Sequence, residues 1–271
     1  MIRGLAALAL FVLLLSAAAQ APLANLVGHE SLRVCADPSD LPFSNEKSEG
    51  FENKIAELFA HELNLPVEYA WYPQVTGFLR NTLLAGRCDV IMGTVAGDSE
   101  VDTTSPYYYT GYVIVFRDDS GWSFTGWDDL RLKDMRIGVV ARTPPADLLL
   151  RHGAMDKAVP YPLTVDTRAD SPSRRMIHDI ADGIIDAGLL WGPLAGYYVQ
   201  HDGLPLKVML LPSEAGAPRL DYHIAMGLRR NEVEWRRKLN GLIHAKQNDI
   251  NRILADYGVP LLDEQGRAMA H

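Results

Sequence analysis

Apolar and polar positions follow the same order of elements twice along the chain. In the first half, the apolar run at residues 32–36 predicts a strand, and apolar residues at helical spacing predict a helix that begins at Phe51 and ends before Asn64. The remaining elements predicted in this half are a strand at 67–71, a helix at 77–85 that Gly86 stops, and an apolar third strand at 88–93.

The second half repeats this pattern. A strand is predicted at residues 136–140, and Pro144 and Pro145 open a short helix, since proline suits the first turn. Ser171 caps a further helix, and a strand follows at 186–190. In both halves a glycine, two further residues and an aspartate come directly before the apolar run of the last strand. Strands that alternate with helices indicate βαβ units and parallel sheets, here in two consecutive α/β lobes.

Two extended segments connect the predicted lobes. Residues 112–116 lie between the halves and residues 221–226 follow the second one, so the chain leaves the first lobe and later returns to it. A long last helix at 232–257 then ends at a glycine with a proline beyond. Lobes joined by two strands can close on a ligand by hinge motion. We therefore predict a first lobe of residues 30–115 and 222–260, a second lobe of residues 120–216 and a C-terminal tail of residues 261–271.

Composition narrows the class of protein. The 271 residues are 48% hydrophobic and 22% charged, which excludes collagenous, low-complexity and disordered chains. The length suits two globular units of roughly 100–150 residues each. With 26 basic and 34 acidic residues the formal charge is −8, and an acidic chain is a poor candidate for nucleic-acid binding, which depends on basic side chains at phosphates.

The N-terminus carries the one long charge-free apolar run of the sequence. Arg3 precedes apolar residues 5–15, and small residues follow, which is typical of a secretory signal peptide. We predict cleavage after Ala19; residues 1–19 then take Arg3 with them, and the mature charge becomes −9. A retained membrane anchor is the alternative, but this run is shorter than the ~20 apolar residues that span a bilayer. We expect an exported protein that does not span a membrane after cleavage.

Several short motifs occur in a fixed order along the chain. They are Leu32-Arg33-Val34-Cys35-Ala36-Asp37, Leu41-Pro42-Phe43, Gly50-Phe51-Glu52, Val101-Asp102-Thr103-Thr104-Ser105-Pro106-Tyr107-Tyr108 and Tyr257-Gly258-Val259-Pro260. With them, residues 31–260 resemble a type II periplasmic solute-binding protein of the family that serves polar amino-acid transporters. This resemblance implies an α/β fold of two lobes, with parallel-rich sheets flanked by helices and two extended hinge crossings.

A second set of motifs is similar to a narrower group. It consists of Cys35-Ala36-Asp37-Pro38, Leu41-Pro42-Phe43-Ser44-Asn45, Gly50-Phe51-Glu52-Asn53-Lys54-Ile55-Ala56, Gly77-Phe78-Leu79-Arg80-Asn81-Thr82-Leu83, Gly86-Arg87-Cys88-Asp89-Val90 and Thr143-Pro144-Pro145-Ala146. These segments resemble the MxaJ/XoxJ group, which are periplasmic binding-protein-like partners of pyrroloquinoline-quinone (PQQ) methanol dehydrogenases.

The resemblance to the MxaJ/XoxJ group implies a periplasmic, non-catalytic accessory role in methanol oxidation, in maturation or activation of the dehydrogenase. The implied partner is a periplasmic quinoprotein methanol dehydrogenase, with its cytochrome c acceptor as a second candidate. Whether the dehydrogenase is of the calcium or the lanthanide type stays open. We expect a monomer without a cofactor, a metal or a nucleic-acid partner.

The two cysteines, Cys35 and Cys88, are fifty-three positions apart, and export to an oxidising compartment permits a bridge between them. Cys35 lies late in the first predicted strand, whereas Cys88 begins the third, its neighbour in this fold. Parallel neighbours about three residues out of step place the two Cα atoms ~10 Å apart, beyond the ~7 Å limit of a disulfide. This inferred register favours two buried free thiols.

Candidate cleft residues follow from the rule that ligands gather beyond the carboxyl ends of strands in α/β sheets. Taken singly, each candidate has a purely structural explanation, such as capping of a turn by Asp37 or Asn45 and packing in the core by Trp191. Tyr107 and the two tyrosines after it offer amphipathic surface for a polypeptide segment or a flat ring, although tyrosines so close together more often pack at a lobe edge. The candidates are Asp37, Asp40, Phe43, Asn45, Thr94 and Tyr107 from the first lobe and Arg142, Thr143 and Trp191 from the second.

Both charged anchors of an amino-acid receptor are missing from this sequence. A guanidinium binds a ligand carboxylate through a planar fork, and the family places it in a Thr-Pro-x-Arg stretch after the third strand. Here residues 94–100 contain two acids and no arginine. The carboxylate that would bind the ligand ammonium is replaced by Trp191. The sequence therefore disfavours free α-amino acids, and we expect the cleft or its rim to receive part of a protein partner.

Catalytic and metal motifs are absent from the sequence. The eight histidines form no HxxxH or HExxH pair, and no GxSxG motif or glycine-rich phosphate loop is present. The spacing of Asp37, Asp40 and Glu52 assigns no hard cation to them. An ABC-transporter receptor for a small solute or peptide is the alternative function. An enzyme on this scaffold is disfavoured, since Arg142 is its one candidate for binding a substrate carboxylate.

Overall fold

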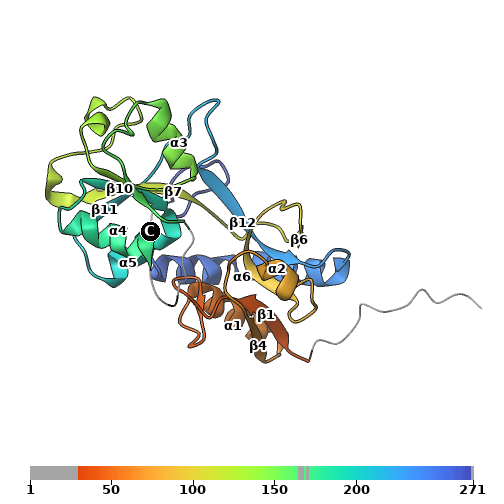
Figure 1. Ribbon diagram of the computed structural model, residues 1–271. Helices are drawn as coiled ribbons and strands as arrows, with labels where there is room; N and C mark the ends of the chain where they lie inside the picture. Colours follow the sequence, from red (N-terminus) through yellow and green to blue (C-terminus); the bar gives the residue numbers. More distant parts are fainter. Residues whose placement is uncertain (1–29, 164–167, 169–170, 270–271) are drawn as a thin grey trace, which may run out of the picture.

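The computed structural model describes residues 30–163, 168 and 171–269. The predicted signal peptide, residues 1–19, lies outside the described residues. The described chain forms two α/β lobes, and two long strands run from one lobe to the other (Figure 1). The fold class predicted from the sequence is confirmed.

The first lobe is built on a sheet whose central strands are parallel. Its elements are β1 Leu32–Ala36, β2 Ser39–Asp40, β3 Ser44–Asn45, α1 Phe51–Leu63, β4 Val67–Trp71, α2 Phe78–Asn81, β5 Val90–Val95, β6 Asp102–Thr103 and α6 Val233–Asp256. β1 pairs in parallel with both β4 and β5, so the carboxyl ends of these strands meet at one edge. The helices α1 and α6 cover one face of this sheet, and α2 lies on the other.

The second lobe repeats this plan. Its elements are η1 Asp118–Ser120, η2 Leu130–Lys133, β8 Ile137–Val140, α3 Pro144–Arg151, β9 Val159–Tyr161, α4 Pro172–Ala181, β10 Ala187–Trp191, α5 Gly192–His201 and β11 Leu206–Leu210. β8 pairs in parallel with β9 and with β10. One hydrophobic core lies on the side of α3, and a second lies on the side of α4 and α5.

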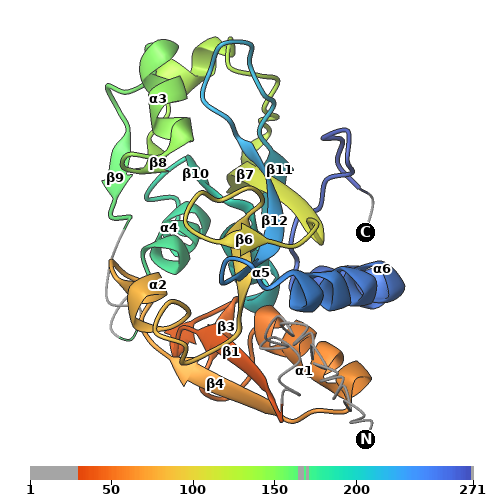
Figure 2. The same cartoon turned by 90° about the vertical axis from the view of Figure 1, so that its right-hand side faces the viewer.

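Two long strands join the lobes, β7 (Tyr108–Arg117) and β12 (Asp221–Leu228). They pair antiparallel, with Asp221 opposite Gly111 and Ile224 opposite Tyr108. β7 continues into the second lobe, where it pairs antiparallel with β10 and β11. The sheets of the two lobes thereby form one ten-stranded sheet, and both crossings predicted from the sequence are strands of it (Figure 2). The domain bounds drawn from the sequence stay a prediction.

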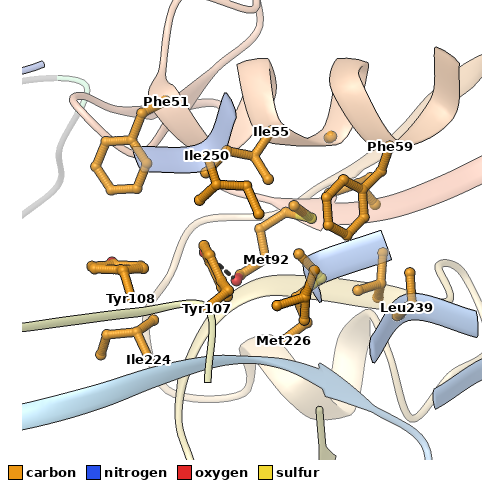
Figure 3. Close-up of a cluster of buried hydrophobic side chains, with 14 of the residues drawn as sticks. Phe51, Ile55, Phe59, Met92, Tyr107, Tyr108, Ile224, Met226, Leu239 and Ile250 are labelled. Atoms are coloured by element: carbon orange, nitrogen blue, oxygen red, sulfur yellow. Dashed lines mark hydrogen bonds between the residues drawn. The ribbon is translucent and has the colours of Figure 1, made fainter. Parts of the chain in front are cut away.

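The helices form where capping and apolar spacing coincide. Phe51, Ile55 and Phe59 recur at four-residue spacing on α1 and are all buried in the first-lobe core, beside residues of α6 and β12 (Figure 3). The Asn53 side-chain oxygen accepts a hydrogen bond of 3.1 Å from the Gly50 N–H at the start of this helix. Sequence pattern and tertiary packing agree here, and α1 has the predicted bounds.

Cys35 and Cys88 form a disulfide, so the prediction of free thiols is wrong. The expected separation of ~10 Å assumed that the third strand already runs straight at Cys88. In the structure β5 begins at Val90, and the Asp89 N–H donates to the Arg33 carbonyl where the chain turns toward β1. This turn brings the two cysteine Cα atoms to 5.4 Å, a distance that a disulfide spans.

The helix predicted at residues 77–85 is shorter in the structure. α2 ends at Asn81, and Thr82 leaves the helical region with φ −122° and ψ −87°. The Thr82 hydroxyl donates to the Phe78 carbonyl, and the fully buried Leu83 then packs beside the disulfide. Burial of Leu83 therefore ends the helix before the glycine that was expected to stop it.

Candidate functional site

A cleft with a volume of about 840 Å³ lies between the two lobes. Its first-lobe wall comes from the β2–β3 hairpin, the first turn of α1 and the carboxyl end of β5. Its second-lobe wall comes from the end of β10 and from α4 and α5. The charged and aromatic residues of its lining are Asp40, Phe43, Glu52, Asp98, Tyr108, Arg174, Trp191, Tyr197, Tyr198 and His201.

Glu52 reaches this cleft from the first turn of α1. Its backbone N–H donates to the Phe43 carbonyl over 3.0 Å, which holds the turn against the β2–β3 hairpin. Its carboxylate lies over Gly93 of β5, and a Cβ placed on Gly93 would be 2.2 Å from Glu52 Oε1. Glycine at position 93 therefore makes room for the carboxylate. Burial raises the pKa of Glu52 to about 8, and the charge of Asp40 adds to the rise.

Asp40 lies on the same wall, in β2. Burial raises the pKa of Asp40 to about 7, and the charge of Asp37 contributes in the same direction. Among the described residues, neither Asp40 nor Glu52 forms an ion pair or a side-chain hydrogen bond. The inner wall of the first lobe thus presents two carboxyl groups that no protein cation neutralises.

The basic groups of the cleft belong to the second lobe and share one carboxylate, that of Asp202. Arg174 Nε lies 3.0 Å from Asp202 Oδ2, and His201 Nδ1 lies 2.8 Å from Asp202 Oδ1. His178 Nε2 lies 2.9 Å from Asp202 Oδ2. Burial by itself raises the pKa of Asp202, but hydrogen bonds from His201, Arg174 and His178 outweigh it and hold the pKa below its usual range. Asp202 thus engages both basic side chains that line the cleft.

Aromatic side chains form the hinge side of the cleft. The Trp191 ring lies edge-on to Tyr112 and Tyr222, with centroid distances of 5.2 and 5.7 Å. Tyr198 reaches across from α5, and its hydroxyl donates to the Leu41 carbonyl over 3.2 Å. This bond ties the second lobe to the β2–β3 hairpin of the first.

Comparison with known sequences identifies the family. The sequence profile of the bacterial extracellular solute-binding proteins, family 3, matches residues 32–259. The chain belongs to this family. Within the described residues, no helix has both the length and the apolar character needed to cross a bilayer.

Individual members of the family are similar over most of the chain. The protein MoxJ of Paracoccus denitrificans is 29% identical over 246 residues, which cover 86% of this chain and 89% of MoxJ. The crystal structure of the periplasmic binding protein XoxJ from Methylobacterium extorquens AM1 is 38% identical with a TM-score of 0.72, covering 86% of this chain and 100% of XoxJ. MxaJ from Methlophaga aminisulfidivorans MPT is 27% identical with a TM-score of 0.74, at 86% and 100% coverage. The predicted MxaJ/XoxJ-type resemblance is confirmed.

Five of the residues predicted for the cleft line it in the structure: Asp40, Phe43, Asn45, Thr94 and Trp191. Phe43 packs edge-on against Phe51 at 5.3 Å. Both polar atoms of the Asn45 side chain bond to Glu49, so this side chain also holds the hairpin turn. The part that these residues take in binding stays a prediction.

Asp37 and Tyr107 lie outside the cleft lining. Asp37 is buried and accepts hydrogen bonds from the Ser39 and Gln74 N–H groups over 2.8 and 2.6 Å, the capping role weighed for it in the sequence. Tyr107 is in the first-lobe core, where its hydroxyl donates to the Met92 carbonyl over 2.7 Å (Figure 3). The neighbouring Tyr108 lines the cleft instead, because successive residues of an extended chain point to opposite sides.

Arg142 and Thr143 also lie outside the cleft lining. Arg142 is exposed and has φ +63°, so the chain turns sharply between β8 and α3. Thr143 is buried, and its hydroxyl donates to the Val140 carbonyl over 2.6 Å at the start of α3. Both residues shape the turn that starts α3.

The family's two charged anchors have no counterpart in the geometry of this cleft. At the end of β5, the Thr94 hydroxyl donates to Asp98 of the following loop over 3.4 Å, and Asp98 accepts from the Glu100 N–H over 2.7 Å. Trp191 is the last residue of β10 and lines the cleft. The three helices α3, α4 and α5 each carry proline in the first turn, which removes N–H donors that would otherwise bind an anion there.

Three cleft residues of α5 were not predicted from the sequence, because no helix was expected there: Tyr197, Tyr198 and His201. The available signal was Pro193, two positions after the apolar strand, since proline favours the first turn of a helix. Arg174 lay in a predicted helix but was not connected with the cleft. Its role depends on Asp202, twenty-eight positions away.

No metal centre is assigned to the cleft. Within residues 30–163, 168 and 171–269, no group of three or more histidine, cysteine, aspartate or glutamate side chains is arranged to hold a metal ion. The cleft presents carboxyl groups on one wall and aromatic groups on the other, and a positively charged group bound between them would favour the ionised carboxylates.

Proposed function

We propose that this chain is a periplasmic, non-catalytic accessory protein of a PQQ-dependent methanol dehydrogenase system. It acts in maturation or activation of the dehydrogenase by binding the enzyme or part of it. Similarity to MoxJ, XoxJ and MxaJ over most of the chain supports an association with methanol oxidation. Membership in an extracellular solute-binding family, together with the apolar N-terminal run, supports the periplasmic location.

The observation that carries this proposal is that the basic side chains lining the cleft are already paired with Asp202. A receptor for free amino acids needs an unpaired guanidinium for the ligand carboxylate. The single arginine of the described lining is Arg174, which Asp202 holds through two hydrogen bonds of 3.0 and 3.2 Å. A zwitterion would therefore find no free cation in this lining.

The shape and surface of the cleft support a polypeptide as the ligand. A volume of about 840 Å³ holds a few amino-acid side chains. Aromatic groups such as Trp191 and Tyr197 supply large contact area at low conformational cost, and tryptophan and tyrosine are frequent among the residues that dominate protein interfaces.

A binding experiment with purified proteins tests the proposal. The mature chain is immobilised, and the methanol dehydrogenase of the same organism is applied with and without PQQ and its metal. We expect a complex with the dehydrogenase, and Trp191→Ala should weaken it by about tenfold or more. Leu84→Ala changes an exposed leucine outside the cleft and should leave binding unchanged. Failure to bind any form of the dehydrogenase would contradict the proposal.

The alternative is an ABC-transporter receptor for a small solute or peptide that is not a free α-amino acid. The two-lobed cleft with its paired connecting strands supports it, since this arrangement suits closure on a ligand. Calorimetry with small solutes separates the two functions. A receptor binds such a solute tightly and forms no complex with the dehydrogenase.

A further inference from the structure

The first-lobe wall of the cleft carries carboxyl groups without a basic neighbour. Asp40, Glu52 and Asp98 all line this wall, and within the described residues none of the three forms an ion pair. Burial raises the pKa of Asp40 to about 7 and that of Glu52 to about 8, as expected when carboxyl groups lose water and gain no cation. A bound cation would supply the missing positive charge and favour the ionised form of these carboxyl groups.

The opposite wall does not neutralise these acids. Arg174 and His201 face the cleft, but both bind Asp202. Tyr198 lines the second-lobe side of the cleft: burial is the main cause that raises the pKa of Tyr198, and the charge of Asp40 adds to the rise. The second-lobe group that interacts electrostatically with Asp40 is therefore a phenol and not a cation.

Aromatic rings complete the surroundings of the two carboxyl groups. Trp191, Tyr197 and Tyr198 line the same cleft as Asp40 and Glu52. Such rings pack against methylene groups and attract a cation over their faces. A flexible stem that ends in a positive charge matches both features, the apolar path and the acidic end.

We propose that the cleft binds a primary alkylammonium group, the end of a lysine side chain on the protein partner, between the carboxylates of Asp40 and Glu52. The source of the lysine rests on the proposed function, whereas the ammonium site itself does not. Two carboxylates suit an ammonium group, which carries three donors on one nitrogen. Calcium takes six to eight oxygen ligands, more than these two side chains offer.

Short peptides test the chemistry of the site directly. The mature chain is titrated by calorimetry with the blocked pentapeptide Gly-Gly-Lys-Gly-Gly and with the same peptide carrying norleucine, a neutral side chain of similar length. We expect the lysine peptide to bind about tenfold more tightly or better, because hydrogen bonds to charged groups are the strong ones. Cadaverine, a free diamine, serves as a third probe and should bind more weakly than the peptide. Equal binding of the lysine and norleucine peptides, or no binding of either, would overturn the proposal.

Three variants locate the binding on the acidic wall. Glu52→Gln and Asp40→Asn keep the side-chain shape and remove the charge, and each should weaken lysine-peptide binding by about tenfold. Gly93→Ala keeps both acidic residues but puts a methyl group 2.2 Å from the position of Glu52 Oε1. The Glu52 carboxylate must then move, so this variant should also weaken binding. Asp118→Asn is the matched control, since Asp118 is exposed and pairs with Lys207 outside the cleft lining. Melting curves of all variants check that they fold.

The outcomes separate this inference from the proposed function. If Glu52→Gln abolishes the lysine preference but no dehydrogenase binds to the wild type, the ammonium site stands and the accessory role fails. If the dehydrogenase binds equally to the wild type, Glu52→Gln and Asp40→Asn, the accessory role stands and the assignment of the ammonium group to a lysine of the dehydrogenase is refuted. Stronger binding of cadaverine than of the peptide would overturn the assignment of the ammonium group to a protein lysine.

Discussion

The disulfide between Cys35 and Cys88 should contribute strongly to stability. It closes a loop with a sequence separation of 53 residues and holds the end of β1 against the start of β5. The chain-entropy relation for a loop of this length gives about 4 kcal/mol of stabilisation at room temperature. We expect the double variant Cys35→Ala/Cys88→Ala to lose about that much free energy of unfolding. Guanidinium titrations followed by circular dichroism and tryptophan fluorescence measure the loss.

Removal of two buried sulfur atoms also leaves a cavity, which needs its own control. Wild type with the disulfide reduced keeps both sulfur atoms and loses only the bridge. The reduced wild type should therefore lose nearly as much stability as the double variant, and the difference between them reports the cavity. A loss below about 1 kcal/mol in both samples would refute the reasoning. So would two titratable thiols in the unreduced, denatured protein.

Three further changes test the stabilising contacts and the cleft. Asp89 is almost fully buried and pairs with Arg33 and Arg229 over 2.5 and 2.8 Å, so Asp89→Asn should cost about 3 kcal/mol in chemical unfolding. Folding raises the pKa of Glu52 from 4.5 to about 8, so between these values the folded state binds more protons than the unfolded state and wild-type stability falls as pH rises. Glu52→Gln lacks this titration, so its melting temperature should rise relative to that of the wild type from pH 5 to pH 8. A constant difference between the two melting temperatures over this range would contradict the prediction. Gly241 is exposed within α6, and a Cβ added there would meet no other part of the described structure within 4 Å. Gly241→Ala should therefore raise the unfolding free energy by about 0.5–1 kcal/mol, and a loss would argue against this helix.

Local pattern was sufficient where an element buries one regular face. The bounds predicted for α1 and β4 agree with the structure, because their apolar positions recur at helical or strand spacing and their ends are marked by Gly50, Asn64 and Pro66. Both crossings were also predicted, since long β-rich apolar runs between the lobes admit few other roles. Their pairing with each other is a tertiary contact that no local pattern encodes.

The cysteine prediction shows how a small local turn overrides an average geometry. Strand spacing alone placed Cys88 too far from Cys35. At the turn, the Asp89 carboxylate binds Arg33 and Arg229 from two other segments. Contacts with residues so distant in sequence cannot be read from the run Cys88–Val90 by itself.

The residues of the candidate site also differ in whether local sequence predicts them. Strand ends located Asp40, Phe43, Thr94 and Trp191, because in parallel sheets the position of a strand's carboxyl end fixes the position of the cleft. The residues of α5 depend instead on how this helix packs. Gly196 of α5 lies so close to the turn after α6 that an added Cβ would be 1.8 Å from the Gly258 carbonyl oxygen, and this long-range contact has no local signature.

The central claim is that the cleft serves a protein partner and not a free amino acid. Calorimetry of the mature chain against its methanol dehydrogenase, with glycine and glutamine as competing ligands, tests it most directly. The account predicts a complex with the dehydrogenase and no heat of binding with either amino acid. Micromolar binding of glutamine or glycine, with no complex formed by the dehydrogenase, would contradict it.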